Sequence, residues 1–218
     1  MQPPFRDDGC RLCPRLAEFL DHHRQLSPDW HNAPVNGYGP VDAPIMLVGL
    51  APGLRGANRT GRPFTGDFAG DLLFSTLNHF GLSQGQYAAR PDDGVTLTGI
   101  RIVNSVRCVP PQNKPTPAEI NTCRQFLIED MAIMTGLKVI ITLGRIAHGS
   151  ALKALNLKEK DHPFGHAAQY RLDSGVELIA SYHCSRYNTQ TGRLTEAAFH
   201  QVFCLLYTSP SPRDLSTS

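Results

Sequence analysis

Short apolar runs alternate with amphipathic segments along this chain. Ile45–Leu50, Ile100–Val106 and Lys138–Leu143 have strand length and are largely apolar, which is typical of strands buried on both faces of a parallel sheet. The segments between them carry apolar residues at helical spacing. This alternation predicts an α/β fold, in which a mainly parallel central sheet lies between two helical layers in an α/β/α sandwich.

One expected helix has a clear start signal. Thr116-Pro117-Ala118-Glu119 combines an N-cap threonine, a proline at the first helical position and the acid of a capping box. A hairpin, or a strand with a short partner, is expected around Asp173-Ser174-Gly175. The helices are expected over residues 14–26, 67–80, 116–134, 145–155 and 195–206.

The chain of 218 residues is long enough for one domain with its own core, which we expect to span residues 1–206. Residues 207–218 (YTSPSPRDLSTS) lack an apolar face, so we expect a disordered tail. The tail also resembles a translated cloning or adapter sequence, which would make it non-native. No apolar run reaches the length of a membrane span, and the N-terminus lacks the layout of a secretory signal. A cytoplasmic, non-secreted protein without membrane contact is therefore expected.

Positive charge is unevenly distributed although the formal net charge is only +2. Residues 43–66, 94–118 and 178–195 contain no acid, and each includes the carboxyl end of an expected strand. Ligands of parallel sheets bind at that edge, so the three stretches predict a basic face for a phosphate-bearing partner. The alternative is three separate solvated loops. The eight basic residues concerned are Arg55, Arg59, Arg62, Arg101, Arg107, Lys114, Arg186 and Arg193.

Four of the six cysteines have a spacing that suits a metal site. Cys10 and Cys13 form a C-x2-C pair, and Cys108 and Cys123 lie in the middle of the chain. In a reducing compartment such cysteines bind metal more often than they form disulfides. Four thiolates suit zinc or a [4Fe–4S] cluster, and the absence of a compact zinc-ribbon repeat favours the cluster. Free buried thiols are the remaining alternative.

The first acid-free loop matches neither a P-loop nor a dinucleotide fingerprint. Its glycines permit close approach of the backbone to a ligand. Phe64 could stack on a flat base or simply plug the core. His183 and Cys184 should point in opposite directions at a strand end, so they form a poor nucleophile–base pair, and a thiol hydrolase is not expected.

Several motifs together resemble a known family. They are Gly49-Leu50-Ala51-Pro52-Gly53, the run NRTGRPFTGD at 58–67, Asn104 followed by CVPPQNKP at 108–115, and His183-x-Ser185 followed by NTQTGRLT at 188–195. From Cys10 to Leu206 the chain resembles the family 5, or B-type, iron–sulfur uracil-DNA glycosylases. The resemblance implies a three-layer α/β/α fold and a monofunctional hydrolase of N-glycosyl bonds. It implies removal of uracil, and of other deaminated bases such as hypoxanthine, at the start of base excision repair.

The resemblance also implies roles for particular residues. It places a [4Fe–4S] cluster on Cys10, Cys13, Cys108 and Cys123, with zinc as the alternative. We expect uracil to be flipped into a pocket that contains Ala51, Gly53, Phe64 and Asn104. Asn104 would pair with the base and His183 would stabilise the departing anion. Ala51 stands where related enzymes carry an activating Asp, so Asn58 is the candidate to orient the water. The expected DNA contacts are Arg59, Arg62, Lys114, Ser185, Arg186, Tyr187 and Arg193.

Two residues of this chain depart from the motifs of that family. Cys184 replaces the usual proline of the family, and Tyr187 also differs, both in the loop expected to enter the minor groove.

One alternative function is a non-catalytic module that binds uracil or damaged DNA through the same pocket. The other is a zinc-stapled hydrolase of small phosphate esters. We expect a nucleoid-associated monomer whose partner is uracil-containing or deaminated DNA.

Overall fold

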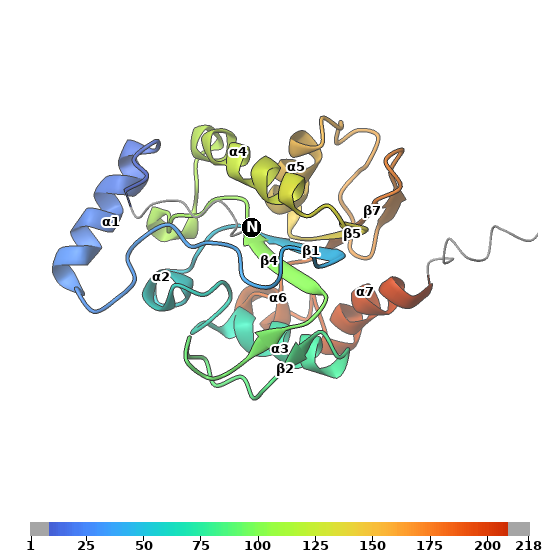
Figure 1. The fold of residues 1–218 in the computed structure, drawn as a ribbon, viewed down its shortest axis with the longest axis horizontal. Coiled ribbons are helices and arrows are strands. Elements are labelled where there is room, and N and C mark those ends of the chain that lie inside the picture. Colours follow the sequence, from blue (N-terminus) through green and yellow to red (C-terminus); the bar gives the residue numbers. More distant parts are fainter. Residues whose placement is uncertain (1–8, 209–218) are drawn as a thin grey trace, which may run out of the picture.

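The central sheet of the computed structural model, which describes residues 9–208, has five strands in the order β4-β1-β5-β7-β6 (Figure 1). Neighbouring strands run parallel except β6, which pairs antiparallel with β7. The predicted, mainly parallel sheet is therefore confirmed. The strands are β1 (Ile45–Gly49), β4 (Ile100–Asn104), β5 (Val139–Leu143), β6 (Gln169–Arg171) and β7 (Glu177–Ser181).

Helices cover both faces of this sheet, which confirms the three-layer architecture (Figure 1). Successive strand residues point to opposite faces. Leu47 packs in a cluster with Phe74 and Phe203 of α3 (Phe68–His79) and α7 (Glu196–Thr208). Met46 packs with Leu127 and Leu152 of α4 (Pro117–Ile133) and α5 (Arg145–Ala154). Each such buried side chain contributes roughly 1.5–3 kcal/mol of hydrophobic stabilisation.

Helix α1 (Pro14–Leu26) lies outside the three layers and forms a third small core. Its Leu16 and Leu20 pack with Val109 and Phe126. Its Arg15 pairs with Glu119 at 2.7 Å, and that carboxylate also completes the capping box of α4. The N-terminal helix is thus held to the start of α4 by a charge-assisted contact as well as by apolar packing.

The structure also contains short elements that the sequence pattern does not predict. These are two helices of one turn, a 3-10 turn and a two-stranded hairpin. They are too short for a periodic apolar pattern and depend on tertiary contacts or on capping, such as that of the last short helix by the Ser185 hydroxyl. The elements are α2 (Ala57–Thr60), η1 (Pro111–Asn113), α6 (Arg186–Gln190), and β2 (Ser83–Gln84) paired with β3 (Thr96–Leu97).

The prediction that disorder begins at residue 207 is wrong. Helix α7 continues through Tyr207 to Thr208. The Tyr207 hydroxyl donates to the carbonyl of Phe80 at 3.0 Å, and the two rings stack with centroids 6.2 Å apart, so tertiary contacts extend the helix. The rest of the predicted tail, residues 209–218, lies outside the described residues. Between residues 9 and 208 no helix is long and apolar enough to cross a membrane.

Candidate functional site

The carboxyl ends of β1, β4 and β7 bring the predicted pocket residues together. Gly49 and Asn104 are register partners at the last position of β1 and β4, and His183 follows β7. They meet the glycine-rich loop that leaves β1. The resulting recess, which we call the inner recess, is lined by Ala51, Gly53, Phe64, Asp67, Asn104 and His183 among others. The predicted convergence of Phe64, Asn104 and His183 is therefore present in the structure.

Gly49 allows these side chains to lie this close. A Cβ atom at Gly49 would stand 2.4 Å from Asn104 Oδ1 and 2.8 Å from the ring of Phe64, far inside contact distance. The Phe64 ring also lies close to the His183 ring, with centroids 5.8 Å apart and planes 23° from parallel. The recess thus combines two flat side chains and one amide.

Two buried polar atoms in the recess have no hydrogen-bond partner among the described residues, Asn104 Oδ1 and His183 Nδ1. Buried polar groups are almost always paired, so such atoms at a recess indicate a polar ligand. Burial lowers the pKa of His183 to about 4, which leaves the imidazole neutral at physiological pH. The amide of Asn188 donates to the His183 carbonyl at 2.8 Å and fixes this loop.

Asp67 is the charged residue of the recess, and the sequence pattern predicts no role for it. It is the N-cap of α3, where its carboxylate accepts the Gly70 N–H at 3.2 Å. Burial raises the pKa of this carboxyl group, while the backbone hydrogen bonds oppose the rise. An aspartate before a helix is readily interpreted as a cap alone. The Asp67 carboxylate lies in the recess because the loop after β1 passes close to it: a Cβ atom at Gly53 would stand 3.1 Å from Asp67 Oδ2.

The prediction that Asn58 faces the pocket is not supported by its position. Asn58 is completely buried, its amide donates to Asn32 Oδ1 at 2.8 Å, and it does not line the inner recess. Asn32 lies in a loop 26 residues away in the chain, so the local sequence around Asn58 could not predict this contact. The neighbouring Ala57 lines the recess, as do the predicted Ala51 and Gly53.

The inner recess adjoins a wider cavity of about 380 Å³, with which it shares His183 and Asp67. Asn113, Ser185 and Arg186 line this outer part. Next to them α6 exposes Tyr187, whose accessible fraction is 71%. The outer cavity therefore connects the recess to the loop that the sequence analysis assigned to the DNA minor groove.

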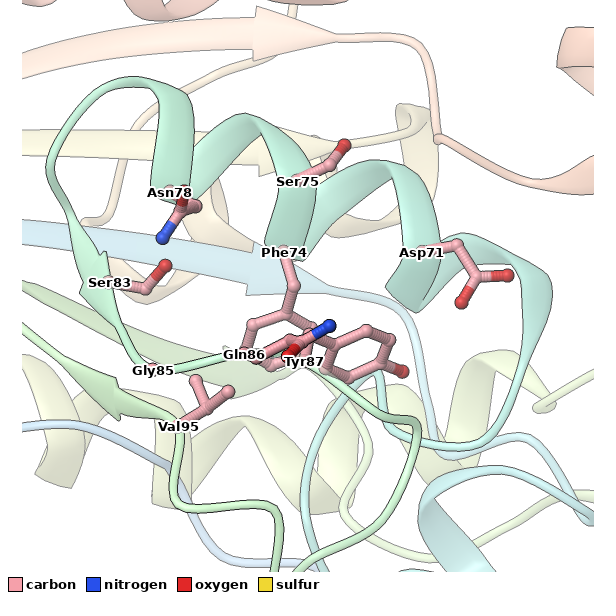
Figure 2. Close-up of a pocket in the computed structure, with 9 residues that line it drawn as sticks. All are labelled: Asp71, Phe74, Ser75, Asn78, Ser83, Gly85, Gln86, Tyr87 and Val95. Atoms are coloured by element: carbon pink, nitrogen blue, oxygen red, sulfur yellow. The ribbon is translucent and has the colours of Figure 1, made fainter.

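A larger cavity, of about 510 Å³, lies elsewhere (Figure 2). Residues of α3, including Asp71 and Phe74, form one wall, and Tyr87 and Val95 from the following segment form another. It contains none of Phe64, Asn104 and His183. Size alone therefore does not locate the candidate site in this fold.

Three of the eight basic residues from the acid-free stretches are buried in ion pairs. Arg62, expected to contact DNA, is 5% exposed and makes a bidentate pair with Asp93. Arg101 and Arg107 share Asp130. The prediction for Arg62 is wrong because its counter-charge comes from another part of the chain. The other five of the eight are exposed and have no ion-pair partner among the described residues: Arg55, Arg59, Lys114, Arg186 and Arg193.

Cys10, Cys13, Cys108 and Cys123 line one small cavity between α1, the loop after β4 and α4. The Arg107 N–H donates to Cys123 Sγ at 3.3 Å. Burial raises the pKa of Cys108 to about 12, so binding of a metal would have to displace the thiol proton. Within residues 9–208 no three acidic, histidine or cysteine side chains are placed to hold one metal ion. A single zinc ion would need sulfurs about 3.8 Å apart, whereas a multi-iron cluster spans more space.

The family model of the uracil DNA glycosylase superfamily matches residues 36–206. A type-5 uracil-DNA glycosylase of Thermus thermophilus is 45% identical over 200 residues, covering 89% of this chain and 90% of that protein. A type-5 enzyme of Mycobacterium tuberculosis is 37% identical over 203 residues, covering 89% and 75%. A type-4 enzyme of Thermotoga maritima is 38% identical over only 114 residues, covering 52% and 51%.

Fold and site together define a member of the uracil-DNA glycosylase superfamily, because the matched segment contains the whole sheet and the inner recess. Within that superfamily the chain belongs to the type-5 group, whose members match it over nearly its full length. The family predicted from the motifs is confirmed.

Proposed function

We propose that this protein removes uracil from DNA by hydrolysing the N-glycosidic bond, with the inner recess as its active site. The observation that carries the proposal is the pair of unpartnered atoms, Asn104 Oδ1 and His183 Nδ1, beside the ring of Phe64. Uracil offers a flat face, an N3–H donor and carbonyl acceptors. Phe64 supplies the stacking surface and Asn104 accepts from N3–H.

A base within a duplex must leave the stack before it can enter this recess. The exposed Tyr187 is suited to fill the gap left by the flipped nucleotide, and Arg186 stands beside it in the wall of the outer cavity. Arg186 also packs over the Phe68 ring, with its guanidinium carbon 5.3 Å from the ring centroid. This contact ties the inserting loop to the first turn of α3, next to the recess.

Bond cleavage leaves negative charge on uracil, and His183 is the group proposed to receive it. A neutral imidazole has one N–H, which would donate to the base oxygen as charge develops there. The low pKa of His183 means that this donor needs no protonation step at neutral pH. A dissociative reaction, in which the base departs before water attacks, therefore has a preorganised stabiliser in His183.

Asp67 replaces Asn58 as the proposed group that acts on water. Its carboxylate lies in the recess and can accept a proton, which an amide cannot. The hydrogen bond from Gly70 N–H fixes its orientation. Asp67 also weakens the case for a non-catalytic binding module, because the pocket then contains both an acceptor for the water proton and a donor for the leaving group.

The exposed cations Arg59, Lys114, Arg186 and Arg193 are proposed to hold the DNA backbone. Ser185, in the wall of the outer cavity, would also contact the DNA backbone. We infer that one copy of the chain suffices, because every group proposed for the chemistry comes from one recess. An enzyme with this substrate would act at the nucleoid.

We further infer that the four-cysteine cavity holds a [4Fe–4S] cluster. The donor set is all thiolate, which suits iron–sulfur chemistry. When bound, the cluster would serve as a cross-link between α1, the loop after β4 and α4. Asn104 precedes this loop and Asn113 ends it in the outer cavity, so the cross-link would also steady the pocket.

The direct test is incubation of the purified protein with a duplex that contains one uracil, followed by alkali to break the abasic sites. A duplex with thymine at the same position is the matched control. Strand breakage only at uracil, reduced at least tenfold by Asp67→Asn, is expected for loss of an assisting group. Binding of the uracil duplex without breakage would instead support the non-catalytic module.

A further inference from the structure

The backbone at Phe64 has an unusual conformation. Its φ is +53°, in the left-handed region that side chains bearing a Cβ seldom adopt. For a bulky residue this conformation is strained, and it persists only where neighbouring groups hold it. The conformation turns the ring of Phe64 toward Gly49 and His183. The groups that hold it therefore determine where a flipped base would stack.

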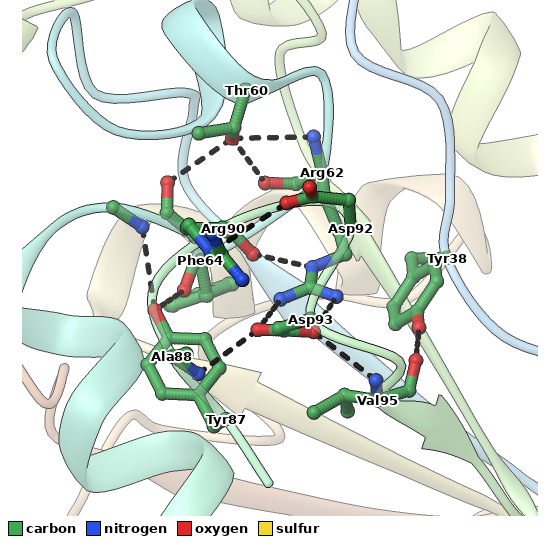
Figure 3. A network of polar contacts seen from close by, with 12 residues as sticks. Tyr38, Thr60, Arg62, Phe64, Tyr87, Ala88, Arg90, Asp92, Asp93 and Val95 are labelled. Atoms are coloured by element: carbon green, nitrogen blue, oxygen red, sulfur yellow. Dashed lines mark hydrogen bonds and ion pairs between the residues drawn. The ribbon is translucent and has the colours of Figure 1, made fainter. Parts of the chain in front are cut away.

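Tyr87 contacts this turn directly (Figure 3). Its hydroxyl donates to the Phe64 carbonyl at 3.1 Å and accepts the Gly66 N–H at 3.3 Å. One oxygen thus bridges both sides of the strained turn. The Tyr87 ring is held in turn by stacking on Phe74, with centroids 4.4 Å apart and planes 13° from parallel. Burial raises the pKa of Tyr87 to about 12, so the hydroxyl keeps its proton.

The buried Arg62–Asp93 ion pair also contacts both the Phe64 turn and the segment that contains Tyr87 (Figure 3). Arg62 Nε donates to the Thr65 hydroxyl at 2.7 Å, within the turn. Asp93 accepts the Ala88 N–H at 3.0 Å, next to Tyr87. The pair therefore ties the segment that carries Tyr87 to the turn that carries Phe64. This is a structural use for the arginine that the sequence analysis assigned to DNA.

Gly70 brings α3 close to the same point. A Cβ atom there would lie 2.0 Å from the Phe64 carbonyl oxygen and 2.4 Å from the Tyr87 hydroxyl. The first turn of α3 starts at the Asp67 cap. The Phe64 ring and the Asp67 carboxylate are therefore placed by one set of contacts, which has the Tyr87 hydroxyl at its centre.

We propose that Tyr87 is a positioning residue for uracil excision, which sets the stacking face of Phe64 without touching the base. This inference rests on the proposed function, since it assigns a role within that reaction. Tyr87 also lines the large cavity of Figure 2, outside the inner recess, so it acts through Phe64.

The test uses Tyr87→Phe, which keeps the stacked ring and removes only the hydroxyl. The kcat for uracil excision should fall about tenfold, since small misplacement at a reacting centre is costly. KM for the uracil duplex should also rise by about tenfold, because the stack on the flipped base contributes to substrate binding. Affinity is also measured for duplexes with 2′-fluorodeoxyuridine, which resists hydrolysis, and with a tetrahydrofuran abasic analogue. The first affinity should drop about tenfold and the second should not change, because only the first duplex has a base to stack.

Tyr38→Phe is the matched control. Its hydroxyl donates to the Val95 carbonyl and its ring faces Arg62, but it does not contact the Phe64 turn. This variant should excise uracil at the parental rate. Equal loss of affinity for both duplexes in Tyr87→Phe would indicate general damage and overturn the proposal. So would parental excision by Tyr87→Phe. A parent protein that releases no uracil from any duplex would overturn the proposed function itself.

Discussion

At the level of single residues, the inner recess depends on the missing side chain of Gly49. Gly49→Ala would place a methyl group against Asn104 and Phe64. We expect at least a tenfold fall in uracil excision, because displacement of about 1 Å in a reacting pocket can cost that much. Gly149→Ala in α5 is the control, since its Cβ would meet nothing nearer than 3.7 Å. Excision rates and melting curves check both variants, and a parental rate for Gly49→Ala would contradict the description of the recess.

His183 gives a second prediction at this scale, for stability rather than for rate. Its pKa is lowered to about 4 in the fold, whereas an unfolded histidine titrates at about 6.5. Between these values the unfolded chain binds a proton that the folded protein excludes, so stability falls as pH drops from 6.5 toward 4. In His183→Asn this contribution is absent. The melting temperature should therefore decrease less between pH 7 and pH 5 in the variant than in the parent. An equal decrease in both proteins would show that His183 is not held as a neutral imidazole in the fold.

At the level of elements, periodicity predicted the long helices and strands because each buries a regular apolar face. The Thr116 capping box and the pairing of β6 with β7 followed from local signals. The short α6 and the β2–β3 hairpin were not predictable, since tertiary contacts hold them.

In the candidate site, too, local patterns predict some residues, whereas contacts between distant segments determine the others. Phe64, Asn104 and His183 meet as expected because parallel strands bring their carboxyl ends to one edge. Arg62 and Asn58 face inward because their partners, Asp93 and Asn32, lie about thirty residues away in the chain, beyond any local pattern.

The proposed [4Fe–4S] cluster would join two helices, α1 and α4. The protein purified without oxygen should be yellow-brown, with broad absorbance at about 400 nm and about four irons per chain. Cys108→Ser should lose both, and its melting temperature should fall as the cross-link is lost. Cys204→Ser is the control, because Cys204 is exposed and lies outside the cavity. A colourless parent protein that contains zinc would support the alternative metal.

At the level of the whole molecule, exposed cations near the recess should make DNA binding strongly dependent on salt. Each lost phosphate contact reduces the slope of log affinity against log salt by about 0.9. Arg186→Ala should show this reduction, because Arg186 lines the outer cavity. Lys153→Ala, in the last turn of α5 and so at the opposite edge of the sheet, should not. Equal slopes for Arg186→Ala and the parent, measured by titration at several salt concentrations, would exclude this contact.

In the proposed mechanism one recess stacks uracil on Phe64, binds it through the amide of Asn104 and stabilises its anion through His183. The most direct test is the rate at which free uracil appears from a uracil-containing duplex with enzyme in excess, for the parent and for His183→Ala. We predict one uracil per duplex for the parent and a rate at least tenfold lower for the variant, as for loss of one oxyanion-type donor. Equal rates for the two proteins would exclude this role of His183 in the excision of uracil.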